Sequence, residues 1–192
     1  YKAMFELGSV KRTAVCLLVD KEEIGSVGAT GMTSFYFENT VAEVINACGD
    51  YSDIKVRRAL NNSRMLSSDV SAGFDPNYPS VMEKNNSAFL GKGLTFNKYT
   101  GSGGKSGSND ASAEYLGSLR KTFDDANVAY QTAELGRIDA GGGGTIAYIP
   151  AAYGMDVIDI GVPILNMHAP YEVSSKADVY ETTKCYKAFY EM

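Results

Sequence analysis

Short apolar runs and longer amphipathic stretches alternate along this 192-residue chain. Short runs enriched in apolar residues predict strands, at residues 13–19, 64–70, 93–99, 127–135 and 155–163. The first run, TAVCLLV, is nearly continuous, as in a strand that is covered on both faces. Apolar residues at helical spacing predict helices, at residues 28–48, 53–60, 111–125 and 175–192. Strands that alternate with helices predict an α/β fold with a mixed, largely parallel sheet flanked by helices.

Capping and turn residues refine the boundaries of these elements. Asn109 or Asp110 is expected to cap the helix at 111–125, and Ser174 or Ser175 the last helix. Residues 71–91 are expected to form a loop, because they include the turn sequence DPNYP. The segment TGSGGKSGSND at 100–110 has the most flexible composition, and GGGG at 141–144 is expected to open a helix or turn that reaches residue 153.

Composition and charge exclude several classes of function. Hydrophobic residues make up 44% of the chain, enough for one globular domain. The net charge of −5 and the lack of a basic stripe argue against nucleic acid or an anionic membrane as partner. No apolar run approaches the ~20 residues that span a bilayer. The three cysteines form no CxxC motif, so we expect neither a disulfide framework nor a thiolate zinc site, and a cytoplasmic location.

The glycine-rich motifs and the single histidine do not match common catalytic signatures. GSGGKS at 101–106 lacks the glycine that a phosphate-binding loop requires five positions before its Gly-Lys pair, where Tyr99 stands. GSVGATG at 25–31 has glycines at three-residue spacing and follows Glu22 and Glu23, which would repel a pyrophosphate. No GxSxG motif accompanies His168, so a serine hydrolase is not indicated.

Acidic residues follow two of the predicted strands, and the histidine follows a third. Asp20, Glu22 and Glu23 come after 13–19, Asp69 lies at the end of 64–70, and His168 follows 155–163. The carboxyl ends of parallel strands meet at one edge of a sheet, so these side chains are expected to lie close together. Carboxylate oxygens with an imidazole suit Zn²⁺, Mn²⁺ or Co²⁺. A bound cation would also neutralise the crowded carboxylates, although a solvated turn and a structural histidine are the simpler alternatives.

Several segments, taken in order, resemble the aspartyl aminopeptidase family of dinuclear zinc metallo-aminopeptidases. They are DKEEIGS at 20–26, SSDVSAGFDPNYP at 67–79, FNKYTGSGGKSGSND at 96–110, GGGGTIA at 141–147 and DIGVPILNMHAPYE at 159–172. The resemblance implies that Glu22 is the general base, that Glu23 and His168 bind one metal ion, and that Asp69 binds the other. It implies a cofactor of two divalent ions, zinc first, with manganese or cobalt as alternatives.

The same resemblance implies a substrate site and an assembly. Lys98 would face the side chain of the substrate's N-terminal residue and favour an acidic one, while Gly143, Gly144 and Thr145 would border the site. For Lys98 an exposed strand-end position, and for the glycine stretch a tight helix entry, remain open alternatives. The expected reaction removes the N-terminal residue of peptides, within a homo-oligomer that is a dodecamer in this family.

The resemblance also implies that residues 1–192 are the C-terminal portion of a catalytic domain. A chain that begins with Tyr1 within an apparent helical stripe is expected to be a fragment. The family's His-x-Asp ligands, bridging Asp and dimerisation domain have no match in this sequence. Asp75, where many relatives have His, and Lys21, where some have His, leave substrate preference open. Three alternatives remain: another metal-dependent amidohydrolase, a fragment that is inactive or serves as a scaffold, and a nucleotide-binding module.

Overall fold

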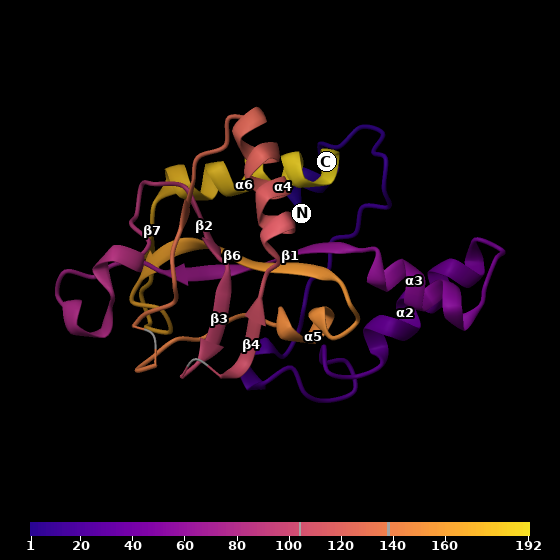
Figure 1. The fold of residues 1–192 in the computed structure, drawn as a ribbon, viewed down its shortest axis with the longest axis horizontal. Helices are drawn as coiled ribbons and strands as arrows, with labels where there is room; N and C mark the ends of the chain where they lie inside the picture. Colours follow the sequence, from indigo (N-terminus) through magenta and orange to yellow (C-terminus); the bar gives the residue numbers. More distant parts are fainter. Residues whose placement is uncertain (104, 138) are drawn as a thin grey trace.

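A five-stranded mixed sheet lies at the centre of the fold (Figure 1). The computed structural model describes residues 1–103, 105–137 and 139–192. The strand order is β1-β6-β2-β5, with β7 added to β6. The strands are β1 (Arg64–Ala72), β2 (Leu94–Asn97), β5 (Tyr130–Thr132), β6 (Asp156–Leu165) and β7 (Val173–Ser174). Parallel ladders join β1 to β6 and β2 to β5, while β2 and β7 run antiparallel to β6. The predicted mixed, mostly parallel α/β fold is confirmed.

Helices and a separate hairpin cover the sheet. Two long helices, α4 (Ala113–Asp125) and α6 (Lys176–Glu191), lie together on one side, and α5 (Tyr148–Ala151) lies on the other with the hairpin (Figure 1). The hairpin pairs β3 (Tyr99–Ser102) with β4 (Ser106–Asp110). The remaining helices are α1 (Lys2–Phe5), α2 (Tyr36–Ala47) and α3 (Asp53–Asn61), with the 3-10 turns η1 (Glu22–Ile24), η2 (Pro79–Val81) and η3 (Lys84–Asn86). No helix among the described residues is long and apolar enough to cross a membrane.

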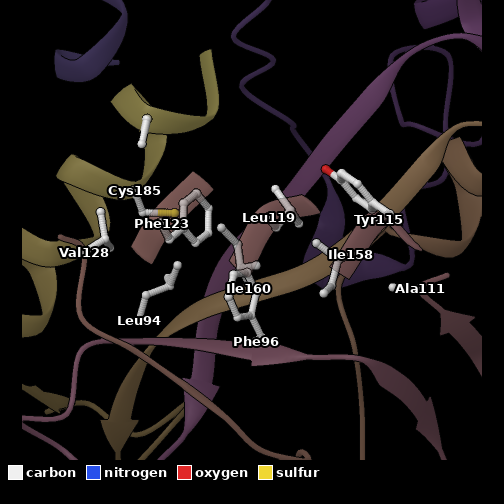
Figure 2. Close-up of a cluster of buried hydrophobic side chains, with 11 residues drawn as sticks. Leu94, Phe96, Ala111, Tyr115, Leu119, Phe123, Val128, Ile158, Ile160 and Cys185 are labelled. Atoms are coloured by element: carbon white, nitrogen blue, oxygen red, sulfur yellow. The ribbon is translucent and has the colours of Figure 1, made fainter. Parts of the chain in front are cut away.

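The main core forms where α4 and α6 pack on the central strands (Figure 2). Phe96 of β2 stacks on Phe123 of α4, with ring centroids 5.4 Å apart and an interplanar angle of 2°. Both side chains are fully buried, as are Ile158 and Ile160 of β6. Burial of several large apolar side chains in one cluster is the main force that holds the helices to the sheet.

Most of the predicted elements occur close to their predicted bounds. The predictions at 53–60, 64–70 and 155–163 correspond to α3, β1 and β6, and the last helix is α6 with Ser175 as its N-cap. The strand predicted at 127–135 is limited to β5. The helix predicted at 111–125 begins after Ser112, whose hydroxyl accepts a hydrogen bond from the Tyr115 N–H. The proposed caps Asn109 and Asp110 are therefore wrong.

The strand predicted at residues 13–19 does not form. This segment has no strand assignment, and Val15 and Leu18 are 62% and 76% exposed. A strand requires a neighbouring chain to accept and donate its ladder hydrogen bonds, and no described strand pairs with this segment. Its apolar composition therefore predicted an extended, covered strand, whereas here the segment is uncovered.

Two other segments also differ from their predictions. The helix predicted at 28–48 begins only at Tyr36, because residues before it form turns in which Thr33 donates hydrogen bonds to the Ser26 carbonyl. The flexible-looking segment 100–110 instead forms most of the β3–β4 hairpin, although Gly104 lies outside the described residues. The glycine stretch at 141–144 is followed by the short helix α5.

Candidate metal centre and substrate site

The two adjacent glutamates lie on a tight turn. Lys21 and Gly25, on either side of η1, both adopt left-handed backbone conformations, with φ of 65° and 87°. The turn is closed by the Ser26 N–H, which donates to the Lys21 carbonyl at 2.7 Å. Glycine adopts such a conformation without steric cost, whereas a non-glycine residue such as Lys21 does not. The turn thus presents Glu22 and Glu23 from successive positions of one closed loop.

Glu23 and His168, two of the predicted metal ligands, lie close together. The Glu23 Oε2 lies 3.7 Å from the His168 Nε2, and the two side chains are 76% and 71% exposed. His168 also has a left-handed backbone, with φ of 65°. Its N–H donates to the Glu172 Oε1 at 2.7 Å, which ties the loop after β6 to a carboxylate four residues later. The backbone around the imidazole is therefore fixed locally, while its ring faces Glu23.

This pair fits the ligand chemistry of zinc. Zinc binds imidazole nitrogen and carboxylate oxygen at about 2.0–2.2 Å, so two ligand atoms of one tetrahedral ion lie roughly 3.4 Å apart. The observed separation of 3.7 Å is close to that value.

Glu22 lies at the centre of a group of charges. Partial burial raises the pKa of Glu22, and the negative charges of Asp69 and Glu23 raise it further, while His168 acts in the opposite direction. Asp69 lies in β1 opposite Gly161 of β6, and its Oδ1 accepts a hydrogen bond from the Val70 N–H at 2.8 Å. The other three site residues predicted from the sequence, Glu23, Asp69 and His168, are therefore electrostatic neighbours of Glu22.

The described residues nevertheless contain no group of three or more His, Cys, Asp or Glu side chains arranged to hold a metal ion. Within residues 1–103, 105–137 and 139–192 the structure brings together one ligand pair, Glu23 and His168. Asp69 approaches closely enough to raise the pKa of Glu22 but not to complete such a group. The metal-ligand roles of these residues stay predictions.

Lys98 lies between the sheet and the β3–β4 hairpin and is not a free cation. Its Nζ lies 2.5 Å from the Asp110 Oδ1, and the two side chains are 44% and 63% exposed. Burial raises the pKa of Glu134, Lys98 lowers it, and the charge of Asp110 raises it. Lys98 therefore has one carboxylate in contact and a second one nearby.

Gly144 and Thr145 are held by a buried carboxylate, Asp159 of β6. Both the N–H and the hydroxyl of Thr145 donate to the Asp159 Oδ1 at 2.9 Å. A Cβ added at Gly144 would lie 3.0 Å from the Thr100 side chain and 3.5 Å from the Asp159 Oδ1. Glycine at this position therefore permits the loop to lie close against β3 and β6, which supports a structural role for it.

Asp159 connects several elements through its other oxygen. The Asp159 Oδ2 accepts hydrogen bonds from the Thr100 hydroxyl at 3.0 Å and the Asn109 side-chain N–H at 3.4 Å. The Thr145 hydroxyl also contacts the Ser67 hydroxyl of β1. Burial raises the pKa of Asp159, and these hydrogen bonds act in the opposite direction. The Asp159 carboxylate thus links β6 to β3, β4 and the glycine loop, and Thr145 of that loop contacts β1.

Three residues that contact the candidate site were not assigned a role in that site from the sequence: Asp110, Asp159 and Glu172. A signal was available for Asp159, because a charged residue in the middle of the apolar run MDVIDIGVP is seldom buried without a polar partner. Asp110 and Glu172 act through tertiary or loop contacts, which spacing along the chain does not reveal.

Comparisons with known proteins all identify the same family. A model of the peptidase M18 family, described as aminopeptidase I zinc metalloprotease, matches residues 2–190. A probable M18 family aminopeptidase 1 from Clostridium acetobutylicum is 65% identical over 189 residues, which cover 98% of this chain and 41% of that relative. The chain therefore spans about two fifths of the length of this curated relative.

Solved structures agree with this result. The crystal structure of aminopeptidase I from Clostridium acetobutylicum matches with a TM-score of 0.89 and 62% identity, over 100% of this chain and 41% of that one. The crystal structure of an M18 family aminopeptidase from Thermotoga maritima matches with a TM-score of 0.86 and 41% identity, over 90% of this chain and 39% of that one.

Proposed function

Because the chain belongs to the peptidase M18 family of aminopeptidase I zinc metalloproteases, we propose that it forms the C-terminal portion of the catalytic domain of a zinc aminopeptidase. The reaction is removal of the N-terminal residue from peptides. The observation that carries this proposal is the contact between Glu23 and His168 beside a partly buried Glu22. A ligand pair next to a free carboxylate is the arrangement that metal-assisted hydrolysis requires.

The uncovered segment 13–19 supports the assignment to a larger domain. Its valines and leucines are exposed, and β1 stands at the end of the strand order. Exposed apolar segments and unpaired strand edges are normally covered in a finished fold. We propose that an N-terminal catalytic segment and a dimerisation domain lie outside residues 1–192. In the full-length protein the N-terminal catalytic segment would cover residues 13–19.

The chain's own residues divide the chemistry. Glu23 and His168 would hold one zinc ion and Asp69 a second, with the remaining ligands supplied from outside this chain. When bound, zinc supplies Lewis-acid polarisation of the scissile carbonyl and lowers the pKa of water. Glu22 accepts the proton of the attacking water and passes it to the leaving amine, a role that its raised pKa supports. Manganese or cobalt are alternatives at the same ligands.

Substrate recognition and assembly complete the proposal. Lys98 would attract an acidic N-terminal side chain, while Gly143, Gly144 and Thr145 border the substrate. We propose a homo-oligomer, a dodecamer by the family resemblance, and a cytoplasmic location in keeping with the absence of a CxxC motif. Residues 1–192 alone are proposed to be inactive, since their described parts contain no group of three metal-binding side chains.

A peptide panel tests the reaction against the main alternative, another metal-dependent amidohydrolase. The full-length protein is given the same tripeptides with a free and with an acetylated N-terminus, and the released residues are quantified. An aminopeptidase cleaves the free peptides and not the acetylated ones, because the α-amino group is part of what it recognises. Equal cleavage of both forms contradicts the proposed function.

A further inference from the structure

The ion pair between Lys98 and Asp110 is built into the backbone of the hairpin. Lys98 directly precedes β3, and Asp110, the last residue of β4, is paired with Tyr99 across the hairpin. The Ala111 N–H donates to the Lys98 carbonyl at 2.9 Å, which holds the two ends of the hairpin beside each other. Because the strands already hold both residues in place, the pair requires little additional ordering of flexible loops.

A second carboxylate adds to the negative charge around Lys98. Glu134 is partly buried, and its backbone N–H donates to the Asn86 carbonyl at 2.7 Å, so its position is set by the chain rather than by Lys98. Lys98 lowers the otherwise raised pKa of Glu134, which indicates that the two charges interact. One ammonium thus faces Asp110 in direct contact and Glu134 nearby.

This arrangement has a consequence for an acidic substrate. A carboxylate that approaches Lys98 must compete with Asp110 for the same Nζ, at which the Asp110 Oδ1 already lies 2.5 Å away. It must also approach Asp110 and Glu134, which both repel it, whereas only Lys98 attracts it. A neutral substrate side chain meets neither obstacle.

We propose that Asp110 is a specificity-determining residue, which competes with the acidic side chain of the substrate for Lys98 and so reduces the preference for acidic over neutral N-terminal residues. This inference rests on the proposed function. It assigns to Asp110 the opposite effect from Lys98: the lysine favours an acidic residue, and its partner limits how strongly.

The chain offers a matched control on α4. Lys121 and Asp125 form an ion pair at 2.7 Å with side chains 76% and 65% exposed, and neither residue contacts the hairpin in the described interactions. Asp125→Asn removes the carboxylate partner of a surface lysine, as Asp110→Asn does, but it leaves the surroundings of Lys98 unchanged. A change in net charge alone would affect both variants equally.

The experiment compares Asp110→Asn, Asp125→Asn and Lys98→Met with the wild type in the full-length protein. The readout is the ratio of kcat/KM for N-terminal glutamate to kcat/KM for N-terminal leucine, on otherwise identical substrates. The interaction energy of an exposed ion pair is about 0.2–1 kcal/mol, so we expect Asp110→Asn to raise this ratio by a factor of about 1.4 to 5. Asp125→Asn leaves the ratio unchanged, and Lys98→Met lowers it.

The two levels of the proposal fail in different ways. A wild type that cleaves neither substrate overturns the proposed function and this inference with it. An active wild type whose ratio is the same in Asp110→Asn, or changes equally in Asp125→Asn, overturns the inference alone. The gain in Asp110→Asn is also expected to shrink at 1 M salt, because screening weakens the attraction between Lys98 and the substrate.

Discussion

Glu23 and His168 come from opposite ends of the sequence, yet the Glu23 Oε2 and the His168 Nε2 lie 3.7 Å apart. The first lies on the η1 turn, and the second lies in the loop between β6 and β7. Lys21, next to the η1 turn, and His168 both adopt left-handed backbone conformations. The pair therefore joins two turns with a locally strained backbone, and such strain is common where a loop serves function.

Removal of the imidazole is expected to release zinc. In the full-length protein, His168→Ala should lose at least one zinc ion per chain, because the proposed site would then lack its nitrogen ligand. Zinc content after dialysis, measured by mass spectrometry of the metal, gives the answer. Glu43→Ala, which removes an exposed carboxylate on α2, is the control and should keep all its zinc. Unchanged zinc content in His168→Ala contradicts the ligand assignment.

Asp159 should make stability depend on pH in a defined direction. Burial raises its pKa above the usual value of 3.8, so the folded state holds this proton more tightly than the unfolded state. Its contribution to stability is therefore fully present below pH 3.8 and is lost as the pH rises through the raised pKa. Asp159→Asn cannot titrate, so the wild-type advantage over this variant should fall as the pH increases.

Denaturant unfolding of both proteins at several values between pH 4 and pH 8 measures this difference. Asp159→Ala serves as a second variant, and it should lower the free energy of unfolding by about 3 kcal/mol, since it leaves several buried donors without an acceptor. A wild-type advantage that is constant with pH contradicts the account of the buried carboxylate.

Asp178 should stabilise the docking of α6 onto the sheet. Its side chain is 1% exposed, and its two oxygens accept hydrogen bonds from the N–H groups of Gly91 and Gly93, at 2.7 and 2.8 Å. Asp178→Ala should lower the free energy of unfolding by about 3 kcal/mol, because two buried donors lose their partner. Glu191→Ala, at the exposed end of the same helix, should change it by less than about 0.5 kcal/mol. Similar unfolding midpoints for the two variants would refute this role.

Local signals in the sequence were sufficient to predict where a helix starts when a single side chain caps it. Ser175 caps α6 as predicted, with its hydroxyl accepting from the Asp178 N–H at 3.4 Å. At α4 the predicted caps fail because their side chains bind elsewhere. Asn109 donates to the Val157 carbonyl and to Asp159, and Asp110 binds Lys98, so the cap moves to Ser112. The N-cap of α4 therefore depends on tertiary contacts, which the local sequence pattern does not reveal.

Non-local pairing explains the remaining errors. The composition of residues 13–19 favours a strand, but a ladder depends on a neighbour that no local pattern identifies. The segment 100–110 contains many glycines and serines, yet it forms a hairpin anchored by the bonds of Thr100 and Asn109 to Asp159. The sequence indicated which residues surround Glu22, whereas the carboxylates next to Lys98, Asp110 and Glu134, became apparent only in the fold.

The most direct test of the account is the turnover of Glu22→Gln in the full-length, zinc-loaded protein, measured together with its zinc content. Glutamine keeps the shape of the side chain but cannot accept a proton from water. We predict that hydrolysis of a peptide with a free N-terminus falls by about 10²–10⁴-fold while zinc content stays at the wild-type level. Turnover near the wild-type rate with zinc fully bound would contradict the role of Glu22 as the general base.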